Sequence, residues 1–442
     1  MNIYALSSGR GPSGIAIIRL SGKDTLKIAQ LISKEKNIKS REANLCKFYN
    51  PTNNQIIDEG LILWFPGPNS YTGEHLAEFH VHGSNAVISL FLDVLSKQAN
   101  SRMAEPGEFT KIAFQNNKID LLEAESIGDL IHSETELQRQ QAIQIMQGNA
   151  SNHYNNLREK LIKALAYIEA KIDFAEDDLP DTVLKQVRIT VQEITSEVKK
   201  ILDDQKIGEK IREGFKVSIT GQVNAGKSSL LNLLSKRKAA IVSNEKGTTR
   251  DIIEVYLNID GYPVILADTA GIRKTEDKVE KEGVSLAIKK IEESDLNLML
   301  FDITSNKIDS LIEKNIKDNS IIVFNKSDLS SNIKKEFKNN DVVLISVKEN
   351  KNIDKLVSLI KKQLKDKFIK NDNILVTRER HRNKLNLCFQ ELNNFLKKKH
   401  DKDIELAAED LRMASRHLGS IIGKVDVEEI LGSIFKDFCI GK

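Results

Sequence analysis

Apolar and polar residues alternate in the first part of the chain and recur at helical spacing farther on. Residues 14–20, 60–65 and 76–82 alternate, which predicts strands whose successive side chains lie on opposite faces of a sheet. From about residue 119 the apolar positions recur at intervals of three and four, which predicts amphipathic helices. This stripe is formed by Leu157, Leu161, Leu165, Ile168 and Ile172.

Strand-like and helical segments alternate from residue 214 to 368, and helical spacing returns afterwards. This order predicts a multidomain α+β and α/β protein, with a doubly wound, mostly parallel sheet that binds its ligand at the carboxyl ends of the strands. We expect an α+β domain over 1–118, an α/β domain over 214–368, and a helical domain in two parts, over 119–213 and 369–442. The α/β domain is then an insertion, and its two ends should lie close together.

Composition places few further limits on function. The 442 residues carry 66 basic and 63 acidic side chains, a net charge of +3, so a uniformly basic nucleic-acid-binding surface is not expected. Three scattered cysteines, Cys46, Cys388 and Cys439, fit a reducing cytoplasm and no metal-type pair. No signal peptide and no apolar run long enough for a membrane span is visible.

The segment 221–229, Gly-Gln-Val-Asn-Ala-Gly-Lys-Ser-Ser, lies between a predicted strand at 215–220 and a predicted helix at 230–234. A G-x-x-x-x-G-K-S sequence between a strand and a helix is the phosphate-binding loop. Its glycines let backbone N–H groups surround a polyphosphate, Lys227 contacts the β- and γ-phosphates, and Ser228 can hold Mg²⁺.

Three further segments follow in the order expected of a guanine-nucleotide site. Residues 268–271, Asp-Thr-Ala-Gly, end an apolar strand; Asp268 can reach Mg²⁺ through a water molecule and Gly271 can sense a γ-phosphate. Residues 325–328, Asn-Lys-Ser-Asp, follow the strand 321–324, and the Asp328 carboxylate can accept two hydrogen bonds from guanine. Ser346, after the strand 342–345, begins a loop that closes over the base. Together these segments indicate GTP rather than ATP.

The segment 247–251, Gly-Thr-Thr-Arg-Asp, precedes a predicted strand over 252–260, and Thr249 is a candidate for completing the Mg²⁺ shell. Ras-like GTPases carry a water-orienting glutamine directly after the Asp-x-x-Gly motif, and Ile272 stands there instead. Another residue must orient the water, or hydrolysis is slow. The residues themselves leave four downstream acids open, namely Glu276, Asp277, Glu280 and Glu282.

In the predicted strand 76–82, Glu78, His80 and His82 share one face. The two histidines are possible metal ligands, but no third ligand is evident, and a polar network is the favoured interpretation.

The chain resembles the hydrophobic-substituted bacterial GTPases in its segments 224–229, 247–251 and 268–273. Residues 70–74, Ser-Tyr-Thr-Gly-Glu, residues 105–110, Glu-Pro-Gly-Glu-Phe-Thr, and the terminal Phe-Cys-Ile-Gly-Lys at 438–442 are similar to the TrmE family of tRNA-modifying GTPases. The resemblance covers essentially the whole chain. It implies a cytoplasmic GTP hydrolase that acts with MnmG, an FAD- and NADH-dependent enzyme, to add an aminomethyl-type or carboxymethylaminomethyl group at C5 of the tRNA wobble uridine.

The resemblance also implies a tetrahydrofolate site in the N-terminal domain, which forms a homodimer within a heterotetramer with MnmG. The ligand is a 5-formyl- or methylene-tetrahydrofolate, and the matching residues are Arg19, Glu78, Lys118 and Lys442. A carboxylate suits the amide-like edge of a pterin, and basic side chains suit the anionic tail. Taken alone, Arg19 is equally a strand-end salt bridge and Lys118 a surface residue. Cys439 is either a nucleophile or redox thiol near the folate, or a small buried residue.

For the nucleotide site, the resemblance implies that Glu280 orients the attacking water. It also implies a K⁺ ion in place of an arginine finger, held by Asn224 and by the loop that includes Ser243, Glu245 and Thr248. The nucleotide and metal contacts expected in all are Asn224, Ala225, Gly226, Lys227, Ser228, Ser229, Ser243, Asn244, Glu245, Lys246, Gly247, Thr248, Thr249, Asp268, Thr269, Ala270, Gly271, Asn325, Lys326, Asp328 and Ser346.

Two positions depart from the usual pattern of this family. Val223 stands where a proline is common, and Val347 replaces the alanine of Ser-Ala-Lys. Neither change removes a ligand. The alternative function is an RNA-binding GTPase switch of the Era or Der type, which shares the nucleotide motifs but carries a KH-type or second GTPase domain. No Gly-x-x-Gly clamp of the KH type is visible here.

Overall fold

The coordinates are a computed structural model of the chain. The residues that it describes are 1–9, 11–173, 181–222, 224–237, 240–241, 254–268, 288–305, 313–330, 337, 339–368, 374–398, 403–425, 434, 438 and 441. The chain divides into two compact units. One contains Met1–Gly128, Met146–Ile162 and Ser415–Lys442, and the other contains Asp129–Ile145 and Lys163–Ala414.

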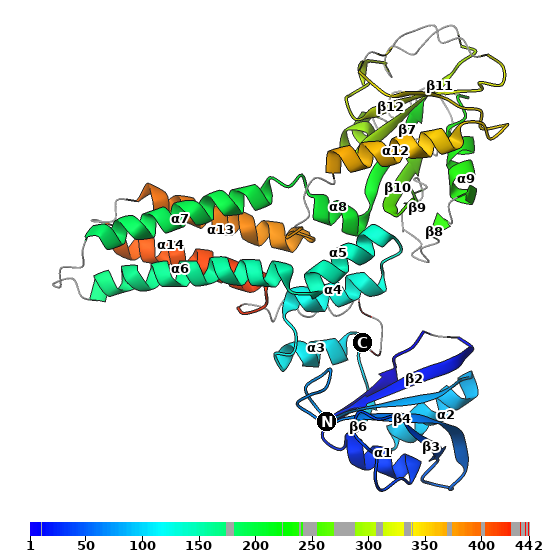
Figure 1. The fold of residues 1–442 in the computed structure, drawn as a ribbon, viewed down its shortest axis with the longest axis vertical. Helices are drawn as coiled ribbons and strands as arrows, with labels where there is room; N and C mark the ends of the chain where they lie inside the picture. The colour runs from blue at the N-terminus through cyan, green and yellow to red at the C-terminus, as the bar shows by residue number, and fades with distance from the viewer. Residues whose placement is uncertain are drawn as a thin grey trace, which may run out of the picture. The chain divides into compact units, whose positions relative to one another are not determined.

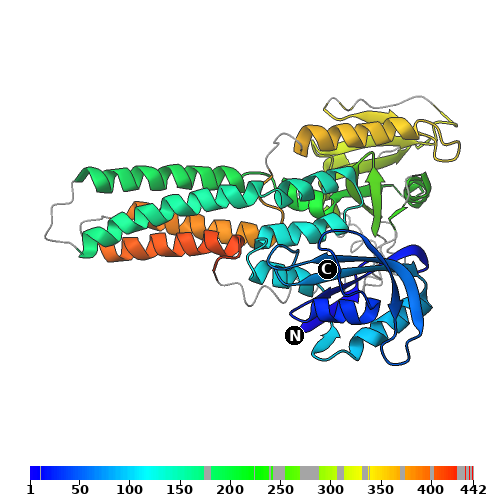
Figure 2. The ribbon, with the colours of Figure 1, turned by 60° about the horizontal axis from the view of Figure 1, so that its bottom comes forward.

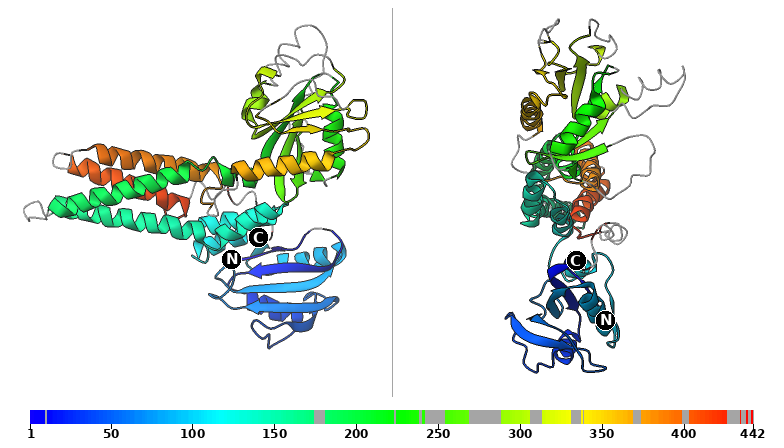
Figure 3. Two further views of the ribbon diagram at one scale, coloured as in Figure 1. Left: turned by 45° about the horizontal axis from the view of Figure 1, so that its top comes forward. Right: turned by 90° about the vertical axis from the view of Figure 1, so that its right-hand side faces the viewer.

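A six-stranded sheet forms the centre of the first unit (Figure 3). Its strand order is β3-β4-β5-β2-β1-β6, and all neighbours are antiparallel except β1 and β6. The strands are β1 (Asn2–Leu6), β2 (Ser13–Ser21), β3 (Asn44–Tyr49), β4 (Ile56–Phe65), β5 (Leu76–Gly83) and β6 (Ser101–Met103). Helices α1 (Thr25–Ser33) and α2 (Asn85–Ser96) bury one face of the sheet through a core that includes Ile32, Phe48, Phe79 and Phe91.

The C-terminal residues of the chain return to this first unit. Phe438 and Ile434 pack with Leu121 of α4 (Leu121–Ile131) in a small core next to α3 (Glu108–Gln115). Gly441 lies against the end of β1: the Ser7 hydroxyl donates to its carbonyl at 2.8 Å, and a Cβ at this glycine would lie 2.2 Å from the Leu6 carbonyl oxygen. Only glycine fits this approach at φ 101°.

Four long helices contribute to the second unit. Residues 163–173 of α6 (Asn149–Asp173), α7 (Asp181–Leu202), α13 (Glu379–Lys397) and residues 404–414 of α14 (Ile404–Ile421) run side by side (Figures 1 and 2). Arg188 of α7 donates to the Leu396 carbonyl of α13 at 2.6 Å, and Arg412 of α14 pairs with Glu169 of α6 at 2.9 Å. Apolar stripes at helical spacing therefore form a bundle from segments on both sides of residues 214–368. Among the described residues, no helix is long and apolar enough to cross a membrane.

A seven-stranded sheet with the order β13-β12-β11-β7-β10-β9-β8 lies in the same unit. β7, β10, β11, β12 and β13 are parallel, and β9 and β8 extend the sheet antiparallel. The strands are β7 (Phe215–Gly221), β8 (Ala240–Ile241), β9 (Glu254–Ile259), β10 (Tyr262–Asp268), β11 (Leu296–Asp302), β12 (Ser320–Asn325) and β13 (Val342–Leu344). α9 (Lys227–Arg237) and α12 (Ile353–Phe368) share a core with one face, and a second core that includes Ile291 and Met299 covers the other.

The short helix α8 (Ile207–Glu213) joins the bundle to this sheet and leads directly into β7 (Figure 1). Arg382 of α13 forms hydrogen bonds with residues in and just before the first turn of α8. The guanidinium forms two hydrogen bonds with Glu209, at 2.7 and 2.6 Å, and a third with Asp204 at 2.6 Å. These hydrogen bonds raise the pKa of Arg382, although its burial opposes them. Arg382 is only 8% exposed and Glu209 only 7%, so this is a buried ionic cluster.

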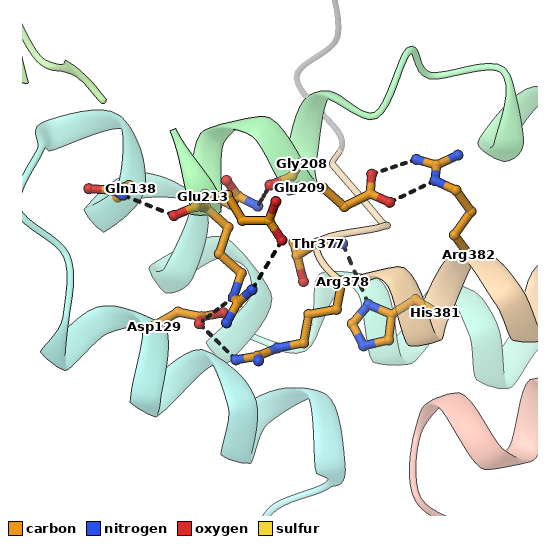
Figure 4. A network of polar contacts seen from close by, with 11 residues as sticks. Asp129, Gln138, Gly208, Glu209, Glu213, Thr377, Arg378, His381 and Arg382 are labelled. Atoms are coloured by element: carbon orange, nitrogen blue, oxygen red, sulfur yellow. Dashed lines mark hydrogen bonds and ion pairs between the residues drawn. The ribbon is translucent and has the colours of Figure 1, made fainter. Parts of the chain in front are cut away.

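The other end of α8 contacts α4 and α5 (Glu136–Met146), and the side-chain nitrogen of Gln138 in α5 donates to the Arg212 carbonyl at 3.1 Å. Asp129 accepts from Arg212 at 3.0 Å and from Arg378 at 2.7 Å through one carboxylate oxygen (Figure 4). Gly208 touches the returning chain so closely that a Cβ there would lie 2.0 Å from the Val376 carbonyl oxygen. The segment that leads into β7 is thus in contact with the segment that follows α12.

The multidomain α+β and α/β fold predicted from the sequence is confirmed, including the mostly parallel sheet. The predicted strands agree with β2, β4, β5, β7, β9, β12 and β13 to within a few residues at their ends. The expected helix over 427–438 lies almost wholly outside the described residues. The four domain boundaries stay predictions.

The substitution Arg382→Ala should destabilise the second unit, because it leaves Glu209 and Asp204 without their buried partner. We expect a loss of about 3 kcal/mol in the free energy of unfolding, measured by urea denaturation with far-UV circular dichroism. Arg412→Ala is the matched control, because Arg412 also pairs with two acids but lies at the surface. Equal unfolding midpoints for the two variants would contradict the importance of the buried cluster.

Candidate functional site

The phosphate-binding loop connects β7 to α9 at the carboxyl end of the parallel strands. At Gly221 the loop leaves β7 so close to β11 that a Cβ would lie 2.0 Å from the Leu300 carbonyl oxygen. At Gly226 the backbone has φ 97°, and a Cβ would lie 2.4 Å from the side-chain nitrogen of Asn325. Glycine is therefore required at both positions. At Gly221 the reason is space, and at Gly226 it is both space and backbone conformation. Val223 lies outside the described residues.

Lys227 is the first residue of α9, and its side chain turns back over the loop. The ammonium group donates to the carbonyl oxygens of Gly221 at 2.9 Å and Gln222 at 2.7 Å. Carbonyl oxygens are weaker partners for an ammonium than the anionic oxygens of a phosphate. A polyphosphate in the loop can therefore take over a cation that is already positioned. Ser228 and Ser229 follow in the first turn of α9, where helix N–H groups favour an anion.

Asn325 at the end of β12 connects this loop to the other loops of the site. Its side-chain nitrogen donates to the Ala225 carbonyl at 2.8 Å, and its side-chain oxygen accepts from the Val347 N–H at 3.1 Å. The residue is only 4% exposed, so these two bonds are shielded from water. One amide thus fixes the distance between the phosphate-binding loop and the loop that begins at Ser346.

Asp328 is held in a defined orientation by Ser346, whose hydroxyl donates to its carboxylate at 2.6 Å. This hydrogen bond is the main cause of a lowered pKa for Asp328, with Lys348 and Lys326 contributing. The carboxylate therefore stays ionised throughout the neutral range. A fixed, ionised acceptor suits a ligand edge with two adjacent N–H donors.

Lys326 has a partner that sequence reasoning did not identify. Its ammonium group pairs with Asp302 at the end of β11. Burial raises the pKa of Asp302, but hydrogen bonds from Lys326 and Thr304 outweigh it, so that the pKa is lowered. The carboxyl ends of neighbouring parallel strands meet at one sheet edge, and that rule would have placed Asp302 at this site.

Many expected site residues lie outside the part of the chain that the structure describes. These residues are Ser243, Asn244, Glu245, Lys246, Gly247, Thr248, Thr249, Thr269, Ala270, Gly271, Glu280, Cys439 and Lys442. Asp268, by contrast, is described as the last residue of β10, on the strand next to β7. The structure does bring together Asn224, Ala225, Gly226, Lys227, Ser228, Asn325, Asp328 and Ser346.

A second polar cluster lies in the first unit, on the sheet face opposite α1 and α2. Arg19 of β2 donates to one oxygen of Glu78 on β5, at 2.8 Å from Nη2 and 3.1 Å from Nε. The guanidinium also lies 5.3 Å from the ring centre of Tyr71 and 5.6 Å from that of Phe109. Burial raises the pKa of Tyr71, despite a hydrogen bond with Thr110 and the nearby charge of Arg19. The Arg19–Glu78 salt bridge therefore lies beside two aromatic rings.

The other expected residues of this cluster lie near it to different extents. Lys118 follows α3 and is exposed, with its side chain close to Gly73 in the loop before β5. Gly441 lies at Leu6 and Ser7, and Leu6 pairs with Ile18, the neighbour of Arg19. The described residues contain no cluster of three or more His, Cys, Asp or Glu side chains that could hold a metal. His82 instead pairs with Asp58 at 2.8 Å.

The fold and the loops of the second unit define a P-loop domain with the features of a GTP site. The family described as "GTP-binding protein TrmE N-terminus" matches residues 2–118, and the "MnmE helical domain" family matches residues 121–439. The chain is 56% identical to the tRNA modification GTPase MnmE of Pelagibacter ubique, covering all of both chains. It is 42% identical to MnmE of Rickettsia rickettsii, over all of this chain and 99% of that one. It is also 41% identical to the mitochondrial tRNA modification GTPase gtpbp3 of Dictyostelium discoideum, over 95% of that chain.

The chain therefore belongs to the MnmE/TrmE family of tRNA modification GTPases.

Proposed function

We propose that this protein hydrolyses GTP and that hydrolysis serves the modification of C5 of the wobble uridine in tRNA, together with MnmG. The full-length likeness to tRNA modification GTPases carries this proposal, and the arrangement of the phosphate and base loops supports it. An Era- or Der-like switch in ribosome assembly is disfavoured, because both the N-terminal and the helical regions match the tRNA-modifying family. We expect a cytoplasmic homodimer that assembles with MnmG into a heterotetramer.

In the proposed nucleotide complex, Lys227 exchanges its two loop carbonyls for the β- and γ-phosphates. Asp328 accepts from the N–H groups of guanine, with Ser346 fixing its orientation. Ser228, at the start of α9, and Thr249 would hold Mg²⁺, and Asp268 at the end of β10 would act on it through a water. When bound, Mg²⁺ neutralises charge on the phosphates.

The substitution Asp328→Asn should exchange guanine for xanthine specificity, because an amide can donate to the oxygen that xanthine carries in place of the guanine amino group. We expect the affinity for GDP to fall by on the order of 10³-fold or more. Affinity for xanthosine diphosphate should rise in the same variant. Calorimetric titration of both nucleotides measures the change. A variant that still prefers GDP would overturn the assignment of the base site.

Hydrolysis in this proposal uses Glu280 to orient the attacking water, because Ile272 cannot. K⁺ would supply the positive charge that an arginine finger supplies elsewhere. Asn224 is the one proposed K⁺ ligand among the described residues. It follows Gln222 and Val223 in the phosphate-binding loop and adopts φ 62°, a conformation in which asparagine is well tolerated. The remaining proposed ligands are Ser243, Glu245 and Thr248.

The rate of GTP hydrolysis should be at least about tenfold higher in KCl than in NaCl of equal concentration, because the cation stabilises transition-state charge. A phosphate-release assay measures both rates. Asn224→Ala should remove most of the difference while leaving the rate in NaCl nearly unchanged. Equal rates of the wild-type protein in the two salts would count against the proposed role of K⁺.

We also propose that the Arg19–Glu78 cluster binds a one-carbon tetrahydrofolate, with Lys118 and Lys442 contributing. Glu78 suits the N–H donors of the pterin edge, and the basic residues suit the anionic tail. Tyr71 and Phe109 provide aromatic surface beside the charged pair. Gly441, the residue before Lys442, is held at the end of β1, the strand that pairs with β2.

Replacing Arg19 with alanine should weaken binding of 5-formyltetrahydrofolate by about tenfold or more, the usual loss for a hydrogen bond to a charged group. Isothermal titration calorimetry measures the affinity. Deleting Lys442 should weaken it as well. Lys47→Ala, which removes an exposed cation from the edge strand β3 of the same sheet, serves as control. If Arg19→Ala binds as tightly as Lys47→Ala, the folate assignment is wrong.

A further inference from the structure

His80 occupies the middle of β5 on the same face as Glu78, because side chains two apart on a strand point to one side. Its neighbours across the sheet are Ile17 on β2 and Leu61 on β4. The ring is therefore flanked by apolar side chains on both adjacent strands. Arg19 and Glu78 lie in the next row of the same face.

One nitrogen of this ring has no hydrogen-bond partner among the described residues. Nε2 of His80 is buried, and it lies 3.7 Å from Oε2 of Glu78, which is too far for a hydrogen bond. A buried polar atom without a hydrogen-bond partner is costly, so such groups call for an explanation. The position of Nε2 beside a carboxylate offers one.

The two oxygens of Glu78 are used unequally. Oε1 accepts both hydrogen bonds from Arg19, whereas Oε2 faces His80. A carboxylate has about four acceptor positions in all. A ligand edge with two adjacent N–H donors takes one position on each oxygen, which leaves a further position on Oε2 for His80.

We propose that His80 is a positioning residue: its Nε2 fixes the orientation of the Glu78 carboxylate when a ligand with paired N–H donors binds. This inference rests on the proposed folate site and adds to it a residue that selects the orientation of the pterin-recognising group. The Nε2–Oε2 separation has to shorten from 3.7 Å to about 2.9 Å, a normal N–H···O distance. A neutral imidazole with its proton on Nε2 is sufficient. The Glu78 carboxylate can then replace its hydrogen bonds from Arg19 with hydrogen bonds from the ligand while the carboxylate keeps its orientation.

The competing interpretation is that His80 only fills space between Ile17 and Leu61. Two substitutions distinguish these roles. His80→Leu keeps an apolar body of similar width but removes the donor. His80→Gln carries an amide nitrogen close to the position of Nε2 and should retain the hydrogen bond.

The test is calorimetric titration of the full chain with 5-formyltetrahydrofolate. We expect His80→Leu to bind about tenfold more weakly, the typical effect of losing one hydrogen bond to a charged group, and His80→Gln to stay within about threefold of wild type. His82→Leu is the matched control. His82 lies two residues farther on the same strand face, but its side chain is 71% exposed and pairs with Asp58. Its substitution should leave the affinity unchanged.

A double-substitution cycle separates positioning from packing. If His80 acts through Glu78, His80→Leu should cause no further loss in a protein that already carries Glu78→Gln. Additive losses would overturn the proposal, as would a His80→Leu variant with wild-type affinity or a His80→Gln variant as weak as His80→Leu. Thermal unfolding of each variant shows whether the fold is retained, and His80→Gln provides the comparison if His80→Leu is unstable. Absence of folate binding by the wild-type protein would instead overturn the folate site itself, and this inference with it.

Discussion

The side-chain amide of Asn325 holds the nucleotide site together. It bonds both to the phosphate-binding loop, at Ala225, and to the loop after β13, at Val347. Because the amide is buried, neither bond competes with water, and losing either would leave a buried polar atom without a partner. Gly226 has to be a glycine because this amide lies where its Cβ would be. One buried amide thus links the loop proposed to bind phosphate to the loop proposed to bind the base.

A comparable arrangement exists in the N-terminal sheet, where Arg19 and Glu78 neutralise each other. The pair keeps both side chains extended over the same face, between Tyr71, Phe109 and His80. Side chains that already point in the required direction lose little conformational freedom when a ligand binds. In both places the basic group is held by an internal acceptor: Lys227 by two backbone carbonyl oxygens, and Arg19 by the Glu78 carboxylate.

Much of this architecture could be predicted from the sequence, because its strongest signals are local. The phosphate-binding loop needs glycines at fixed spacing between a strand and a helix, and the chain has them at Gly221 and Gly226. Strand alternation likewise placed Glu78 and His80 on one face. The ion pairs were not predictable in this way, because each joins residues that meet only in the tertiary fold.

Two of these pairs show why. Lys326 pairs with Asp302, which the sheet-edge rule places at this site without identifying its partner, and Arg382 pairs with Glu209, which is 173 residues away in the sequence. Ion pairs between residues distant in sequence have no periodic signature, unlike the apolar stripes of the helices. The way in which α8 is attached to α13 therefore could not be predicted from the sequence.

The long sequence separation between α7 and α13, which pack together in the bundle, has a consequence for synthesis on the ribosome. α7 packs against α13, but α7 ends at Leu202 and α13 begins only at Glu379. At a synthesis rate of about 5–20 residues per second, the ribosome begins α13 roughly 10–35 s after it has completed α7. The inserted sheet can fold during that interval, whereas α7 still lacks its packing partner α13. All strands of the inserted sheet are therefore synthesised before α13 and α14, the last two helices of the bundle.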